Sequence, residues 1–251
     1  MRVITLIAVL VLSSSGSVLA QEYQEFISRE DGFKATFPGT PTMTTTTFKS
    51  EYGVDLPAHL YTVTKGQERY TALVADYRDI KKLADERAAK ACPTGQGDER
   101  SCGLNNAGRG YWKEELGGAL LHATFGFIQR DAKMTHLAWA WQDLVEGYEI
   151  QIVNNRDQSQ TFAYISMHQN RLYILEATVP RGAAVPGLFQ QSMGYVDAEG
   201  RGVRYALPYS NVHAEWPNDF PAQPMRTGQG GGGGRGAGAG APAAPAGGRG
   251  Q

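Results

Sequence analysis

The alternation of apolar and polar residues predicts a chain rich in β-strands. Residues 26–28 and 33–37 flank Glu30-Asp31-Gly32, where the Asp-Gly pair supplies the positive φ of a tight hairpin turn. Short turns join most of the predicted strands, so we expect a largely antiparallel sheet. The further extended runs are 60–63, 70–77, 120–128, 134–141, 148–153, 161–167, 172–179 and, with a weaker pattern, 203–207.

One hairpin can be registered from its side chains. A two-residue turn at Gln169-Asn170 pairs Met167 with Leu172 and Ile165 with Ile174, so that like residues face each other. The same register also pairs His168 with Arg171 and Tyr164 with Leu175. Both faces of this hairpin are then apolar, which predicts a sheet covered on both sides.

Two helices are expected to supply part of that cover. Residues 80–91 carry an apolar stripe at helical spacing, with Asp79 as the expected N-cap. A second helix is predicted to start at Pro186 and to run to Gly194. The glycine-rich and polar residues 92–110 between these helices indicate a long irregular excursion. Two helices on a long antiparallel sheet predict an α+β layer sandwich.

Four segments resemble the PsbP and Mog1-like fold family. They are FISREDGFKATFPGTPT (26–42), YTALVADY (70–77), RLYILEATVP (171–180) and FQQSMGYVDAEGRGVRY (189–205), within a resemblance that covers roughly residues 24–207. The resemblance implies an α/β/α sandwich with a central, largely antiparallel sheet and few helices. It also implies an accessory or interaction protein without catalysis, and it supplies no catalytic residues.

The first twenty residues have the pattern of a secretory signal peptide. Arg2 precedes a ten-residue apolar run at 3–12, and small residues precede a cleavage site between Ala20 and Gln21. An uncleaved membrane anchor is the lesser alternative, because a spanning helix needs about 20 apolar residues. We therefore expect a periplasmic or secreted protein with no membrane span in the mature chain.

Composition divides the mature chain into one globular domain at 21–221 and a disordered tail at 222–251. Twelve of the last 26 residues are glycine, and a flexible spacer is favoured over a nucleic-acid-binding arm because the tail has three arginines and no aromatic residue. The formal net charge of the whole chain is −1. A charge this close to zero gives no electrostatic footprint for nucleic acid, so no nucleic-acid partner is expected.

Cys92 and Cys102 are the only cysteines, and both remain after signal removal. Export places them in an oxidising compartment, so we expect them to form an intramolecular disulfide. A metal site would need further ligands close in sequence, and a catalytic Cys-x-x-Cys would have two intervening residues where this chain has nine.

Motifs for catalysis, cofactors and metals are missing from the sequence. The five histidines show no metal-ligand spacing, and an offset between His122 and His136 on neighbouring predicted strands argues against a shared zinc. Ser192 lacks the first glycine of a nucleophile elbow. Glu114 and Glu115 would point to opposite faces of a strand. We therefore expect no enzyme activity, no cofactor and no metal; the remaining histidines are His59, His168 and His213.

Two groups of aromatic residues are candidates for a contact surface. Leu137, Trp139 and Trp141 share one strand face and are interpreted as buried core, with a platform for sugars or peptides as the alternative. Tyr111 and Trp112, at the end of the irregular excursion, are expected to be exposed and form the preferred contact site.

Three functions are compatible with these features. The favoured hypothesis is an exported accessory or binding protein of the bacterial envelope that contacts a protein partner. A small-ligand carrier with an apolar pocket and a hydrolase with dispersed catalytic residues are the alternatives.

Overall fold

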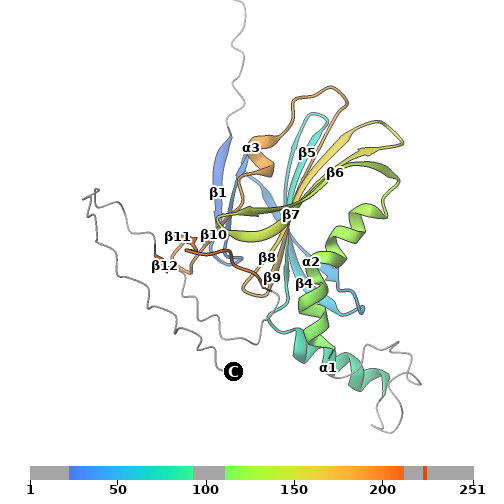
Figure 1. Cartoon of the computed structure of the whole chain (residues 1–251), viewed down its shortest axis with the longest axis vertical. Helices are drawn as coiled ribbons and strands as arrows, with labels where there is room; N and C mark the ends of the chain where they lie inside the picture. Colours follow the sequence, from blue (N-terminus) through green and yellow to red (C-terminus); the bar gives the residue numbers. More distant parts are fainter. Residues whose placement is uncertain (1–22, 93–110, 212–222, 225–251) are drawn as a thin grey trace, which may run out of the picture.

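The computed structural model describes residues 23–92, 111–211 and 223–224. A long, twisted antiparallel sheet lies at its centre, with two helices on one face and a smaller sheet with a short helix on the other (Figure 1). This arrangement confirms the expected α+β class with few helices. One outer layer is built mainly of strands, because the second predicted helix is much shorter than its apolar pattern indicated.

The central sheet has seven strands, and every neighbouring pair is antiparallel. The β5–β9 pairing joins the first half of the chain to the second. The predicted register of the β8–β9 hairpin is confirmed, since Met167 pairs with Leu172 and Ile165 with Ile174. In spatial order the strands are β3 (Thr42–Lys49), β4 (Asp55–Lys65), β5 (Glu68–Asp76), β9 (Arg171–Val179), β8 (Gln160–His168), β7 (Val145–Asn154) and β6 (Ala132–Gln142).

The two long helices, α1 (Ile80–Ala91) and α2 (Trp112–Ile128), cover one face of this sheet. Ile80 of α1 and Phe127 of α2 pack into the same buried cluster as Ile165 of β8. The apolar stripe of α1 is confirmed at Ile80, Ala84 and Ala88, but Asp79 makes no side-chain capping bond. Helix α1 is therefore stabilised by packing rather than by its cap.

The other face is covered by the smaller sheet and by α3 (Gly187–Gln190). The predicted opening hairpin is confirmed, with Gly32 at a φ of +68° in its turn. Phe33 and Tyr195 of this layer pack with Tyr164 of the central sheet. The smaller sheet consists of β1 (Gln24–Ser28), β2 (Phe33–Phe37), β10 (Gly194–Val196), β11 (Gly202–Arg204) and β12 (Gln223–Pro224).

The strand predicted at 120–128 is wrong, because these residues form the second half of α2. The buried residues Leu116, Ala119, Ala123 and Phe127 recur at helical spacing, and this signal extends into residues N-terminal to the predicted run. The apolar and β-branched residues of 120–128 fit either element in isolation.

Three smaller predictions also need correction. The helix expected from Pro186 to Gly194 is one turn long, and Gly194 already begins β10. The weak strand at 203–207 shortens to β11. The threonine-rich strand β3 was not predicted, and β12 falls inside the region expected to be the disordered tail.

Candidate functional site

The most distinctive exposed feature of the described residues is a pair of tryptophans on β6. The rings of Trp139 and Trp141 lie 4.4 Å apart, centroid to centroid, at an interplanar angle of 70°. Trp139 is 53% exposed and Trp141 is 49% exposed, and Leu137 on the same strand face is also exposed. The three side chains form what we call the β6 patch.

The interpretation of Leu137, Trp139 and Trp141 as core is therefore wrong. Trp139 pairs with Tyr148 of β7, and Tyr148 pairs with Ile165, so the β6 patch belongs to the helix-covered face of the sheet. Helix α2 packs on β7 and β8, and the three β6 side chains remain substantially exposed. The alternative reading requires these residues to be exposed, as they are, while binding of sugars or peptides stays a prediction.

Strand β6 is also an edge of the central sheet, with β7 as its one neighbour within the described residues. The β6–β7 turn follows the Gln142–Val145 pair, and antiparallel pairs alternate between hydrogen-bonded and non-hydrogen-bonded. Trp141, Trp139 and Leu137 occupy the non-hydrogen-bonded positions. Their backbone N–H and C=O groups therefore point to the free edge.

This edge lacks the usual protection against pairing with another chain. Edge strands commonly carry charged residues or proline. Residues 134–142 of β6 contain no Lys, Arg, Asp, Glu or Pro. A bulge between Met134 and His136 interrupts the register, and the strand is regular from there to Gln142. The threonine-rich β3 at the opposite edge has no comparable aromatic pair.

A buried hydroxyl fixes the end of β6 that carries the tryptophans. Asp143 and Leu144 form the turn with φ of 49° and 62°, values that favour glycine or asparagine. The Tyr164 hydroxyl accepts from the Gln142 N–H at 3.1 Å and donates to the Val145 carbonyl at 3.0 Å. Because this hydroxyl lies between the two backbone groups, the turn is held although neither turn residue is glycine.

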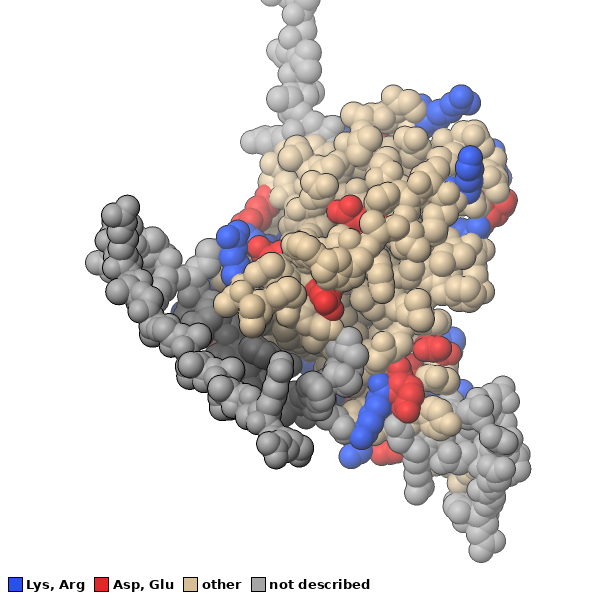
Figure 2. Space-filling view, in the orientation of Figure 1, with Lys and Arg blue, Asp and Glu red and all other residues tan. Residues whose placement is uncertain are grey.

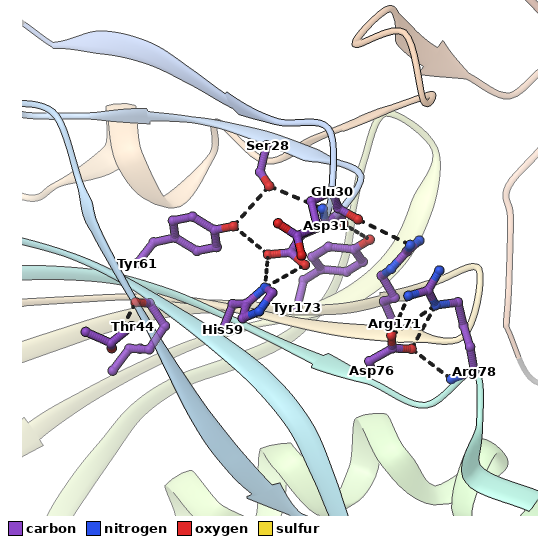
Figure 3. Close-up of polar contacts among 11 residues, drawn as sticks. Ser28, Glu30, Asp31, Thr44, His59, Tyr61, Asp76, Arg78, Arg171 and Tyr173 are labelled. Carbon is purple, nitrogen blue, oxygen red and sulfur yellow. Dashed lines mark hydrogen bonds and ion pairs between the residues drawn. The ribbon is translucent and has the colours of Figure 1, made fainter. Parts of the chain in front are cut away.

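A cluster of polar residues joins the β1–β2 hairpin to the central sheet (Figure 3). The buried carboxylate of Asp31 accepts from His59 Nδ1 at 2.9 Å and from the Tyr61 hydroxyl at 2.5 Å. The Tyr173 hydroxyl donates to the Asp31 carbonyl at 2.8 Å. Burial, together with the hydrogen bond to Asp31, raises the pKa of Tyr61 well above its ordinary value, so Tyr61 keeps its proton. We call Ser28, Asp31, His59, Tyr61 and Tyr173 the hairpin latch.

The hairpin latch has part of the geometry of a hydrolytic site. The His59–Asp31 pair resembles the base and orienting acid of a catalytic triad. The Ser28 hydroxyl, however, contacts the Tyr61 hydroxyl at 3.0 Å and the Asp31 N–H at 3.2 Å, and no described hydroxyl or thiol hydrogen-bonds to His59. The observed contacts attach the hairpin to β4 and β9.

His168 lies in a separate aromatic cluster, which includes residues of the segment that follows β11. Its Nε2 is 2.5 Å from the Tyr205 hydroxyl, and its ring packs against Tyr195 and Tyr209. Burial, with a smaller contribution from the charge of Arg171, lowers the pKa of His168 to about 3. His168 is therefore a neutral core histidine at physiological pH.

The preferred contact residues from the sequence are half-buried rather than exposed. Tyr111 packs against Tyr52 with ring centroids 5.6 Å apart, and Trp112 packs against the helix-side core with the Lys81 ammonium 5.8 Å from its ring centroid. Both lie at the start of α2. A contact role for Tyr111 and Trp112 stays a prediction.

Glu114 and Glu115 lie in the first turn of α2, so the strand geometry considered for them from the sequence does not exist. Glu114 is exposed, whereas Glu115 is buried and accepts from the Ser50 hydroxyl at 2.6 Å. Burial raises the pKa of Glu115. This pairing with Ser50 ties α2 to the end of β3.

The candidate residues His122, His136 and Ser192 lie in different parts of the structure. His122 lies on α2, so the expected strand geometry with His136 does not exist. The Ser192 hydroxyl donates to the Phe189 carbonyl at 2.8 Å and accepts from the Thr36 N–H at 2.8 Å, which is a structural role. Across residues 23–92, 111–211 and 223–224, no three His, Cys, Asp or Glu side chains cluster as a metal site.

Several predictions fall outside the described residues. These include the cleavage site at Ala20 and Gln21, His213, and Cys102 as the partner of Cys92. The disulfide therefore stays a prediction. Among the described helices, none has the length and apolar character needed to cross a membrane.

Comparisons with known proteins add one distant likeness. No protein-family model matches the chain, and no curated protein matches it. The solution structure of cyanobacterial PsbP (CyanoP) from Synechocystis sp. PCC 6803 is similar at 15% sequence identity, with 68% of this chain and 87% of that chain covered and a TM-score of 0.35. Membership of the PsbP and Mog1-like fold family stays a prediction.

Proposed function

We propose that this protein is an exported, non-enzymatic binding protein whose partner adds an extended segment to the free edge of β6. The observation that carries the proposal is the exposed Trp139–Trp141 pair on an unprotected edge strand. In the proposed mature protein, a single domain at 21–221 presents this edge after removal of residues 1–20.

Strand addition suits both the backbone and the side chains of β6. An added strand would hydrogen-bond to the outward N–H and C=O groups of Leu137, Trp139 and Trp141, which supplies affinity without sequence requirements. Alternate side chains of that strand would lie over the two indole rings. Large aromatic residues commonly provide most of the binding energy at such surfaces.

The surrounding surface favours an apolar partner segment. Figure 2 shows a largely uncharged surface in this view, with Lys and Arg at its margins and a few Asp or Glu side chains within it. Helix α2 adds exposed Leu121 and Ile128. The partner segment is therefore expected to alternate apolar residues toward this face with polar residues toward the solvent.

Photo-cross-linking in cells tests this proposal. A photoreactive phenylalanine analogue replaces Trp141, and the same analogue replaces the exposed Thr45 on β3 as the matched control at the opposite edge. The expected result is an adduct of this chain with a different protein at position 141 alone. An adduct with twice the mass of the chain, equal adducts at both positions, or no adduct would contradict the proposal.

A second pair of variants separates backbone pairing from loss of a side chain. Leu137→Pro removes an outward N–H that the sheet itself does not use, and Leu137→Ala removes the same side chain but keeps the N–H. We expect Leu137→Pro to abolish the cross-link at position 141, while Leu137→Ala retains most of it. Equal loss in both variants would show that side-chain contact alone binds the partner.

A further inference from the structure

A cavity of about 330 Å³ lies between α2 and the central sheet, away from the β6 patch. Its walls come from β3, β4, β5 and β9 on the sheet side and from the second half of α2. This volume falls near the lower end of the range of small-ligand sites, which is about 300 to 1,000 Å³. The cavity is partly open to solvent, since Arg69, Phe125 and Gly126 of its lining are exposed, and it has room for a small molecule or for the greater part of one hydrocarbon chain.

The cavity has an apolar end and a polar end. The strand register places apolar residues in one cross-strand row and polar residues in the next. Leu60, Leu73 and Ile174 form one cross-strand row on β4, β5 and β9. Thr71 and Glu176 form the next row on β5 and β9. Phe48 of β3 and Phe125 of α2 add to the apolar lining.

The polar end carries one positive charge without a partner in the described part of the chain. The Arg130 guanidinium forms two hydrogen bonds with the Glu176 carboxylate, at 2.7 and 2.9 Å, so these two charges offset each other. Arg69 lines the same cavity, lies two residues before Thr71 on β5, and forms no hydrogen bond or ion pair with the described residues. His122 contacts the Lys49 carbonyl at 3.1 Å.

Gly126 leaves the wall of α2 open beside this cavity. A Cβ added at Gly126 would meet no atom within 4 Å. Glycine is the least favourable residue of a helix interior apart from proline, so helix stability does not require it here. The space beside Gly126 is consequently available to a bound molecule.

We infer that this cavity binds an elongated apolar molecule with a single terminal carboxylate, of the class of a medium-chain fatty acid. Its hydrocarbon chain lies along Leu60, Leu73 and Ile174, and its carboxylate pairs with Arg69. A guanidinium matches the planar, two-oxygen geometry of a carboxylate. The inference goes beyond the proposed function, because it concerns a separate surface and rests on none of the β6 contacts.

Calorimetric titration of the full mature chain tests the charge requirement. Decanoate, added below its micelle concentration, is expected to bind saturably with one molecule per chain. Decylamine has the same chain with an opposite charge and is expected to bind at least about tenfold more weakly. Arg69→Gln should weaken decanoate binding by about tenfold, whereas Arg181→Gln, in an exposed loop, should leave it unchanged.

A steric pair of variants tests the location. Gly126→Leu fills the cavity with a residue that favours helix, so the variant should fold as judged by circular dichroism and should no longer bind decanoate. Gly117→Leu places the same side chain at an exposed position of α2 and should bind as the parent does. Unchanged decanoate binding in Gly126→Leu, equal binding of decylamine, or no saturable binding would overturn the inference.

Discussion

Trp139 and Trp141 stack edge to face on β6, with ring centroids 4.4 Å apart, while each remains about half exposed. Each ring covers part of the other, and the fixed β6–β7 turn keeps their strand in place. The patch is therefore organised before any partner arrives, and little conformational entropy remains to be lost on binding.

The hairpin latch should contribute measurably to stability. Asp31→Asn replaces a buried carboxylate that accepts from His59 and Tyr61, and we expect the free energy of unfolding to fall by about 1 to 3 kcal/mol. Asp55→Asn removes an exposed ion pair with Lys49 and should cost less than about 1 kcal/mol. Urea denaturation of both variants measures the difference, and equal losses would contradict a structural role for the latch.

His168 should make stability depend on pH. Its folded pKa of about 3 lies below the unfolded value of about 6.5, so protonation favours the unfolded chain. This contribution is complete above pH 6.5 and is lost progressively as the pH falls toward 3. We expect the parent protein to lose up to about 1.4 kcal/mol of unfolding free energy per pH unit in this window through this one group.

The variant His168→Gln removes that group and should flatten the pH profile between pH 6.5 and 4. His136→Gln changes an exposed histidine of β6 and should keep the parent slope. Denaturation at a series of pH values measures both slopes. If His168→Gln retains the full slope, other groups account for the acid sensitivity.

Two glycines should respond to alanine in opposite directions. Gly117 is exposed within α2, and an added Cβ meets nothing within 4 Å, so Gly117→Ala should stabilise the protein by about 0.5 to 1 kcal/mol. A Cβ at Gly147 of β7 would lie 2.3 Å from the Ile165 carbonyl oxygen, so Gly147→Ala should cost about 1 to 3 kcal/mol. Thermal denaturation of the two variants decides this, and a shift of the same sign in both would contradict it.

Export predicts a disulfide between Cys92 and Cys102. Thiol labelling of the folded, non-reduced protein should detect no free cysteine, and peptide mapping should recover the two cysteine peptides joined. Closure of this short loop is expected to stabilise the fold by about 2.7 kcal/mol in the chain-entropy model. Two free thiols, or a disulfide-linked dimer as the main species, would contradict the pairing.

The local sequence pattern was sufficient to predict the structure wherever residues close in sequence determine it. The β8–β9 register follows from matching apolar faces across a two-residue turn, and Gln169 and Asn170 both have the positive φ that such a turn needs. Helix α1 follows from its apolar stripe. The strand predicted at 120–128 is part of helix α2, because a short apolar run fits a strand as well as a helix.

The candidate site depended on contacts that a local pattern does not contain. Whether Trp139 is buried is decided by where α2 packs, and α2 packs on β7 and β8. The hairpin latch combines residues from β1, the first turn, β4 and β9, which lie far apart in sequence. The sequence indicated both the aromatic residues and the hairpin, but not what covers or joins them.

Hydrogen exchange at individual β6 amides tests the central claim most directly. It is measured on the parent protein with and without the partner that cross-linking at position 141 identifies. The outward amides of Leu137, Trp139 and Trp141 exchange with solvent in the free protein and should be strongly protected in the complex. The inward amides of Ala138 and Ala140, already bonded to β7, should change little. Outward amides that exchange equally fast in both states would contradict strand addition at this edge.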